Sequence, residues 1–205
     1  NRLNKINGLS DIGISSLAYD KENKIVVIAY NNTNIDLIKD GSFINITDIK
    51  LKDIFGEKKI NNIYINNGIA YLSCSFGLVL LDLENEEIKD TYKIGEDGNF
   101  VGINDCAIND TSIFAATTDG LYYADINSPS LFDFSTWAKH PNYSGEIRDI
   151  TITPSELIVN NLGESIFIKY FNNTTIHVSD TTLDLYFDNS NHLTLTDSNF
   201  IKIQD

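Results

Sequence analysis

The feature that most constrains the fold of this chain is an internal repeat of about forty residues. Each repeat contains a run of β-branched and aromatic residues, a polar turn, a second apolar run, a tight turn and a third run. The first runs end at Tyr19, Ile65, Ile108, Ile152 and Phe187, at intervals of 46, 43, 44 and 35 residues. Several strands in a repeat of roughly 40–50 residues are typical of propeller blades. We therefore expect an all-β fold, a β-propeller.

Two turns recur in every repeat, and both are rich in Asn, Asp, Gly and Ser. The first turns are DKEN at 20–23, NNG at 66–68, NDTS at 109–112, TPSE at 153–156 and DNSN at 188–191. Such residues form turns through side-chain hydrogen bonds to their own backbone or by tolerating positive φ. A β-sandwich is the alternative with a similar density of strands, but it does not require two turns at a fixed period.

A fourth and more polar strand completes most repeats and gives the expected blade boundaries. It is expected at residues 43–46, 88–94, 131–137 and 174–178. Within a single domain, 1–205, the four-stranded antiparallel blade units then cover residues 9–46, 60–94, 101–137, 147–179 and 183–205. The last unit is incomplete, or an N-terminal strand at residues 3–6 closes it into a five-bladed ring; otherwise the chain is part of a larger ring. The one expected helical turn lies at Asp48–Gly56.

Composition excludes some partners and leaves others open. The formal net charge is −14, which repels phosphate backbones and argues against nucleic acid. No run of apolar residues approaches the roughly 20 needed for a transmembrane helix. The chain contains no Met, so we expect a mature form or a piece of a longer protein.

The residues that usually carry chemistry form no recognisable set. His140, His177 and His192 have no companions at metal-ligand spacing, and His140 is expected in a solvated loop. Gly95–Asn99 lacks the ligands of a calcium loop and is expected to be a plain loop. We find no nucleophile elbow and no phosphate loop, so we expect no catalytic residue, metal or cofactor. A glycosidase-like pair of carboxylates stays open, because acidic residues are numerous.

Three smaller features complete the candidates. Cys74 and Cys106 are expected to be buried thiols, and a bridge between them would need neighbouring strands. A positive island stands out against the acidic chain and comprises Lys50, Lys52, Lys58 and Lys59, with Phe55 among them. It is either a solvated loop or a contact for an anion or a partner. Propellers bind at one end of the ring, and here the second turns place Asn34, Phe76, Asp119 and Gly163 at the candidate end.

Longer stretches resemble a known family. GLSDIGISSLAYD, VVIAYNNTNIDLI and GEKKINNIYINNGIAYLSCSFGLVLLDLENEEIKDTYKIG are similar to the PorZ-like N-terminal β-propeller of the bacterial type IX secretion system. The similarity runs from about residue 9 to 95 and continues more weakly to about 145. TTDGLYYAD in the third unit also resembles the propeller repeat of two-component regulators.

The resemblance implies an exported protein at the outer-membrane surface or in the periplasm. It implies seven-bladed propellers in tandem, a sorting domain, and work with other secretion proteins or with a surface glycan or lipopolysaccharide. We therefore expect a non-catalytic interaction module, not an enzyme. The alternative is a periplasmic sensor domain of a hybrid two-component regulator (a histidine kinase) that binds a glycan. A hydrolase or lyase on the same scaffold is a third possibility, because a fold does not fix a function.

Overall fold

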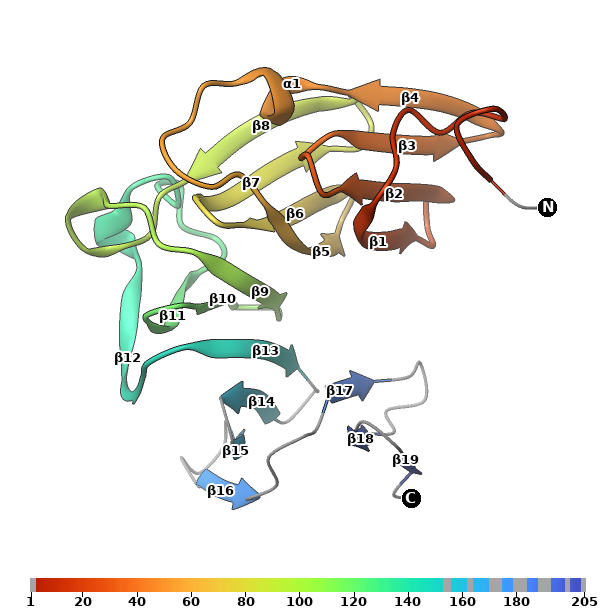
Figure 1. The fold of residues 1–205 in the computed structure, drawn as a ribbon. Helices are drawn as coiled ribbons and strands as arrows, with labels where there is room; N and C mark the ends of the chain where they lie inside the picture. Colours follow the sequence, from red (N-terminus) through yellow and green to blue (C-terminus); the bar gives the residue numbers. More distant parts are fainter. Residues whose placement is uncertain are drawn as a thin grey trace. The chain divides into compact units, whose positions relative to one another are not determined.

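The computed structural model describes residues 3–152, 156–161, 164–169, 175–178, 184–187, 193–197 and 200–203. Their strands form antiparallel sheets in which each strand pairs with the next one along the chain (Figure 1). The chain divides into two compact units, one of residues 1–103 with 132–135 and one of residues 104–131 with 136–205.

The first unit contains two four-stranded sheets. The first sheet is β1 (Ile14–Asp20), β2 (Ile25–Tyr30), β3 (Ile35–Lys39) and β4 (Ser42–Ile46), and the second is β5 (Ile60–Asn66), β6 (Ile69–Cys74), β7 (Gly77–Asp82) and β8 (Glu87–Tyr92). Between them lies a short helix, α1 (Asp48–Leu51), which confirms the first turn of the expected helical segment. A 3-10 turn, η1 (Glu96–Gly98), follows β8, where a plain loop was expected.

Most of the remaining strands belong to the second unit. One sheet is β9 (Ile103–Ile108), β10 (Ser112–Thr117), β11 (Gly120–Asp125) and β12 (Ala138–Ser144), with η2 (Phe134–Thr136) before β12. The next is β13 (Ile147–Ile152), β14 (Glu156–Asn161), β15 (Glu164–Lys169) and β16 (Thr175–Val178), and the last is β17 (Asp184–Phe187), β18 (Leu193–Asp197) and β19 (Phe200–Ile203).

Side-chain caps explain why the polar turns recur. In the β1–β2 turn, Asp20 Oδ1 accepts from the backbone N–H groups of Glu22 and Asn23, while Asn23 Nδ2 donates to Asp20 Oδ2. Asp82 and Asn85 make the same set of bonds in the β7–β8 turn. The Asp-x-x-Asn pattern therefore satisfies backbone donors that the turn leaves without a strand partner.

Glycine is required where an outer strand crosses close to the start of its neighbour. Gly77 begins β7 at φ 131°, and a Cβ there would lie 2.4 Å from the carbonyl oxygen of Tyr92. Gly120 begins β11 at φ 145°, and its Cβ would lie 2.6 Å from the carbonyl oxygen of Tyr143. Neither the dihedral angle nor the space admits a side chain.

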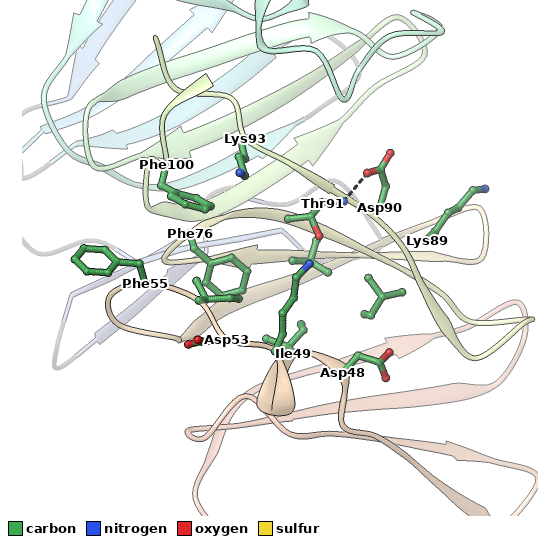
Figure 2. A pocket seen from close by; sticks show the side chains of 14 residues that line it. Asp48, Ile49, Asp53, Phe55, Phe76, Lys89, Asp90, Thr91, Lys93 and Phe100 are labelled. Atoms are coloured by element: carbon green, nitrogen blue, oxygen red, sulfur yellow. Dashed lines mark hydrogen bonds between the residues drawn. The ribbon is translucent and has the colours of Figure 1, made fainter. Parts of the chain in front are cut away.

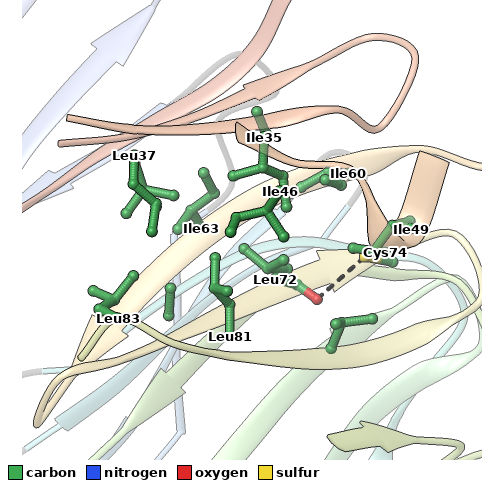
Figure 3. Close-up of a cluster of buried hydrophobic side chains, with 14 of the residues drawn as sticks. Ile35, Leu37, Ile46, Ile49, Ile60, Ile63, Leu72, Cys74, Leu81 and Leu83 are labelled. Atoms are coloured by element: carbon green, nitrogen blue, oxygen red, sulfur yellow. Dashed lines mark hydrogen bonds between the residues drawn. The ribbon is translucent and has the colours of Figure 1, made fainter. Parts of the chain in front are cut away.

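The core of the first unit lies between its two sheets (Figure 3). Ile35 and Leu37 of β3 face this core with Leu72 and Cys74 of β6. The buried side chains of this core cluster are Ile25, Val27, Ala29, Ile35, Leu37, Ile46, Ile49, Ile60, Ile63, Ala70, Leu72, Cys74, Phe76, Val79, Leu81 and Leu83. Leu78 and Leu80, on the opposite face of β7, are also buried. A strand buried on both faces needs a continuous apolar run, and GLVLLD supplies one.

Asparagines link successive inner strands. Asn61 Nδ2 on β5 donates to the carbonyl of Ile103, and Asn104 Nδ2 on β9 donates to the carbonyl of Ile147, each at 2.8 Å. The pairing of β5 with β6 is irregular between Ile60 and Asn62, which places Asn61 at a bulge. A bulge redirects a side chain away from its own sheet, so Asn61 can reach the next inner strand.

Two expected strands need correction. The expected strand at residues 3–6 is instead part of a turn, in which the backbone N–H groups of Asn7 and Leu9 both donate to the carbonyl of Asn4. Ring closure through that segment is therefore not seen among the described residues. The fourth strand of the third sheet is β12, because residues 131–137 form turns around the buried Trp137, whose Nε1 donates to the carbonyl of Leu131.

Cys74 and Cys106 are both buried thiols. Burial strongly raises the pKa of Cys74, so its thiol stays protonated. No helix in the part of the chain that the structure describes is long and apolar enough to cross a membrane.

Candidate functional site

An open groove lies along β8, the outermost strand of the second sheet (Figure 2). Its cavity volume is about 860 Å³, within the range of ligand-binding clefts. Its lining comes from α1 and the following loop, from the start of β7 and from β8 and the loop after it: Asp48, Ile49, Lys52, Asp53, Ile54, Phe55, Phe76, Val79, Ile88, Lys89, Asp90, Thr91, Lys93 and Phe100. We call it the β8 groove.

One wall of the β8 groove is built by α1 and the loop that follows it. Ile49 anchors α1 because its side chain is buried in the core of the first unit. Lys58 Nζ donates to the carbonyls of Lys50 at 2.8 Å and Lys52 at 3.0 Å, and it lies 3.5 Å from that of Ile49. An ammonium group at the end of a helix satisfies carbonyls that have no partner in the helix. Lys58 therefore holds this wall in place.

Ser75 fixes the other end of the same loop. Its Oγ donates to the carbonyl of Glu57 at 2.6 Å and accepts from the backbone N–H of Lys59 at 3.0 Å. The loop is thus tied at both ends, while Phe55 between them is 97% exposed. The large apolar ring of Phe55 is therefore in contact with solvent.

Three phenylalanines give the β8 groove its apolar part. Phe76 is buried at its floor, whereas Phe55 and Phe100 are exposed at its edges. In Figure 2 all three rings lie toward the left of the view, with Lys93 above them. Lys93 Nζ lies 4.5 Å from the centre of the Phe100 ring, within the range of a cation–π interaction.

The charged residues of the groove balance in number, with Lys52, Lys89 and Lys93 against Asp48, Asp53 and Asp90. Asp90 Oδ1 accepts from the backbone N–H of Thr91 at 2.7 Å. None of the ion pairs found among the described residues joins a lysine of the groove to one of its aspartates. Burial, together with the nearby carboxylate of Asp90, raises the pKa of Tyr92 to about 12, so this phenol beside the groove is neutral near pH 7.

The structure gives different surroundings to the four lysines of the expected island. Lys50 Nζ pairs with Asp11 at 3.0 Å, and Lys58 is engaged with backbone carbonyls. Lys59 is exposed beside Ser75, and only Lys52 lines the β8 groove. Contact with an anion or a partner stays a prediction for these residues.

The four second-turn residues also differ in their environments. Asn34 is buried, and its Oδ1 accepts from Asn45 Nδ2 at 3.1 Å. Phe76 lines the β8 groove, and Asp119 pairs with Lys139 at 2.7 Å. Gly163 lies outside the described residues.

Residues considered for metal or acid–base chemistry take structural positions. His140 lies in β12, not in the loop that was expected; its ring is 4.5 Å from that of Tyr143, and burial lowers its pKa. His192 lies outside the described residues, and His177 lies in β16. Across the ranges that the structure describes, no three His, Cys, Asp or Glu side chains are gathered as metal ligands.

Sequence reasoning missed Phe100 and Lys93. Lys93 directly follows β8, within the strand expected at residues 88–94, and Phe100 lies in the loop after it. The available signal was an aromatic residue in a loop, GEDGNF, that the strand pattern does not use to build a core. Only the structure shows that the Phe100 side chain is 50% exposed.

The comparisons with known proteins agree with this fold. Residues 1–138 match the family model of the type IX secretion protein PorZ, N-terminal β-propeller domain. PorZ of Porphyromonas gingivalis, described as an essential bacterial surface component of that system, superposes with a TM-score of 0.84 at 24% identity. The extracellular domain of BT3049, a putative hybrid two-component system protein of B. thetaiotaomicron, superposes with a TM-score of 0.70 at 17% identity. No curated protein matches the sequence.

These matches cover 98% and 100% of this chain but only 27% and 30% of the two solved chains. The chain therefore spans less than a third of the length of either solved protein. The expected all-β fold with four-stranded antiparallel propeller blades is confirmed, and so are both resemblances on which the expectation partly rested. Because the family model covers well over half of the sequence, the chain belongs to the family of PorZ N-terminal β-propeller domains of the type IX secretion system.

Proposed function

We propose that this chain is a non-catalytic interaction module within a surface component of a type IX secretion system. The β8 groove carries the proposal, because it combines exposed phenylalanines with charges that have no ion-pair partner inside it. Exposed aromatic surface beside polar groups is typical of protein interfaces. Membership of the PorZ family supports a place among the secretion proteins at the cell surface.

A capture experiment tests this proposal. The 205-residue chain is immobilised and incubated with detergent extracts of outer membranes from a bacterium that has a type IX system. We expect secretion-system proteins to be enriched over an unrelated propeller of similar charge. Recovery of no such protein in repeated extractions would contradict the proposal.

A second function has one specific observation in its favour, the similarity to the BT3049 extracellular domain over the whole chain. In that case the chain would be a periplasmic sensor domain that binds a glycan. Calorimetric titration with a panel of neutral oligosaccharides separates the two functions. Saturable binding of a saccharide, together with a histidine kinase in the same reading frame, would favour the sensor.

A further inference from the structure

We infer that the β8 groove binds a short segment of a protein partner through one large apolar side chain and a neighbouring carboxylate. The apolar side chain lies among Phe55, Phe76 and Phe100, and the carboxylate pairs with Lys93. This inference rests on the proposed function, because it names the chemistry of the partner at the same site.

The apolar part of the inference follows from the geometry of the three rings. Phe55, Phe76 and Phe100 line one cavity, and none of the ring contacts found among the described residues joins two of them, so the cavity can take another side chain beside them. Leu51, the last residue of α1, is 77% exposed, and the ring of Phe134 lies close to Gly98 while remaining 40% exposed. Exposed apolar side chains of this size are typical of contact with a macromolecule.

Charge complementarity selects a carboxylate. Lys93 lies on the β8 side of the groove at the aromatic end, over the ring of Phe100. Asp53 lies on the opposite side, beside α1, and Asp48 and Asp90 lie to the right in Figure 2. An acidic residue next to the apolar anchor would therefore meet Lys93, while a basic residue farther along the segment would meet Asp48 or Asp90.

The polar lining favours a peptide over a neutral sugar. Thr91 is the one uncharged polar residue among those that line the groove, and the lining contains no Asn, Gln, Ser, Tyr or Trp. Apolar rings next to a lysine match an apolar and an acidic side chain, whereas a neutral sugar has no charge with which the lysine can pair.

The edge of β8 indicates that side chains, and not an added strand, make the contact. The pairing of β7 with β8 is irregular between Leu80 and Leu81, and the N–H of Thr91 is taken by Asp90. Bulges and occupied edge groups oppose pairing with a further strand. The segment is therefore recognised by what its side chains place in the groove.

Selection from a random peptide library on phage tests the inference. The immobilised 205-residue chain is the target, and a Phe55→Ser, Phe100→Ser double variant is the counter-target. We expect the enriched peptides to share a large apolar residue with Asp or Glu within two positions. Peptides enriched equally on both targets, or peptides without an acidic residue, would overturn the inference. Binding of purified lipopolysaccharide that depends on Phe55, with no peptide enriched, would overturn it too.

Calorimetric titration with the most enriched peptide then measures the two contributions. Phe55→Ser and Lys93→Gln should each raise Kd about tenfold, equivalent to ~1.4 kcal/mol. Lys93→Gln should also remove much of the salt dependence. Ile6→Ser is a matched control because Ile6 is also 97% exposed, and Lys21→Gln controls for the loss of a surface charge. An equal effect of the controls would refute the assignment.

The outcomes separate this inference from the proposed function. If the chain captures secretion-system proteins and its Phe55→Ser variant captures them equally well, the interaction module stands and the groove assignment fails. If the groove binds peptides as expected but the chain captures no secretion protein, the assignment stands and the proposed function fails.

Discussion

Removal of the Asp36 carboxylate should destabilise the first unit more than any other loss of a single charge there. Asp36 is the second residue of β3 and is fully buried. Its Oδ2 accepts from Tyr30 Oη at 2.6 Å and from the backbone N–H of Ser10 at 2.7 Å, and its Oδ1 accepts from Asn45 Nδ2 at 2.8 Å. Each of these donors would lose Asp36 as an acceptor.

The magnitude follows from what Asp36→Ala leaves behind. A hydrogen bond to a charged group contributes about 1.5–3 kcal/mol, and a buried donor without a partner costs a comparable amount. Asn45 keeps acceptors at Asn34 Oδ1 and the Ile35 carbonyl, so it loses only part of its hydrogen bonding. Tyr30 is fully buried, and its hydroxyl group loses Asp36 Oδ2 as its hydrogen-bond acceptor. We expect the free energy of unfolding to fall by about 3–5 kcal/mol, and by about 1–2 kcal/mol for Tyr30→Phe.

Equilibrium urea denaturation measures these differences, with Glu22→Ala as the control for the loss of an exposed carboxylate. In the double variant Tyr30→Phe, Asp36→Ala the two effects should not add, because both remove the same bond. A loss below about 1 kcal/mol for Asp36→Ala, or additivity in the double variant, would refute the reasoning.

The effect of Asp36→Ala should also depend on pH. Burial alone would raise the pKa of Asp36, but hydrogen bonds from Ser10, Tyr30 and Asn45 outweigh burial and hold the pKa below its usual value. A carboxyl group whose pKa is lower in the folded state stabilises above its unfolded pKa of about 3.9 and stops stabilising as pH falls through the folded value. The difference in stability between wild type and Asp36→Ala should therefore be constant near neutral pH and shrink below about pH 4.

Three further variants probe the repeat and the wall of the groove. Asn104→Ala removes the bond to the carbonyl of Ile147 and should lower the free energy of unfolding by about 1 kcal/mol in urea denaturation; an unchanged midpoint would contradict the proposed link between inner strands. Gly120→Ala places a Cβ against the carbonyl of Tyr143 at a positive φ and should cost about 1–3 kcal/mol; an unchanged Tm in calorimetry would contradict this. Lys58→Met should speed amide hydrogen exchange in residues 47–58 while β5 to β7 keep their protection; equal speeding in those strands would show that Lys58 supports the whole sheet.

The blade pattern could be predicted because two local requirements repeat with the blades. Strands buried on both faces need apolar runs, as in Ile25–Tyr30, and their turns need caps such as Asp20 or close-approach glycines such as Gly77. These requirements act within a few residues of each other, so the sequence displays them directly. The position of β12 was missed because residues 131–137 are as aromatic as a strand, and the burial of Trp137 in a turn depends on a hydrogen bond to Leu131.

The candidate site was only partly predictable. The sequence shows a cluster of positive charge at Lys50, Lys52, Lys58 and Lys59. It does not show which of these lysines donates to backbone carbonyls and which lines a groove. Phe100 lines the groove only because residues 40 or more positions away in the chain form the opposite wall. Exposure of an aromatic ring is a property of the assembled unit and has no local signature.

The β8 groove is formed by two long connections between sheets that both lie next to β8. These connections do not follow the pattern of the repeat. Residues 47–59 join β4 to β5, and residues 93–102 join β8 to β9; neither resembles the short turns within a sheet. Lys58 and Ser75 anchor the first connection at both ends, yet Phe55 within it contributes nothing to the core. An exposed apolar ring that does not stabilise the fold is more readily explained by a role in binding, whereas buried residues are explained by packing. Loss of Phe55 should therefore leave Tm unchanged while it weakens binding, and a fall in Tm comparable to that of Gly120→Ala would show that the loop is part of the fold.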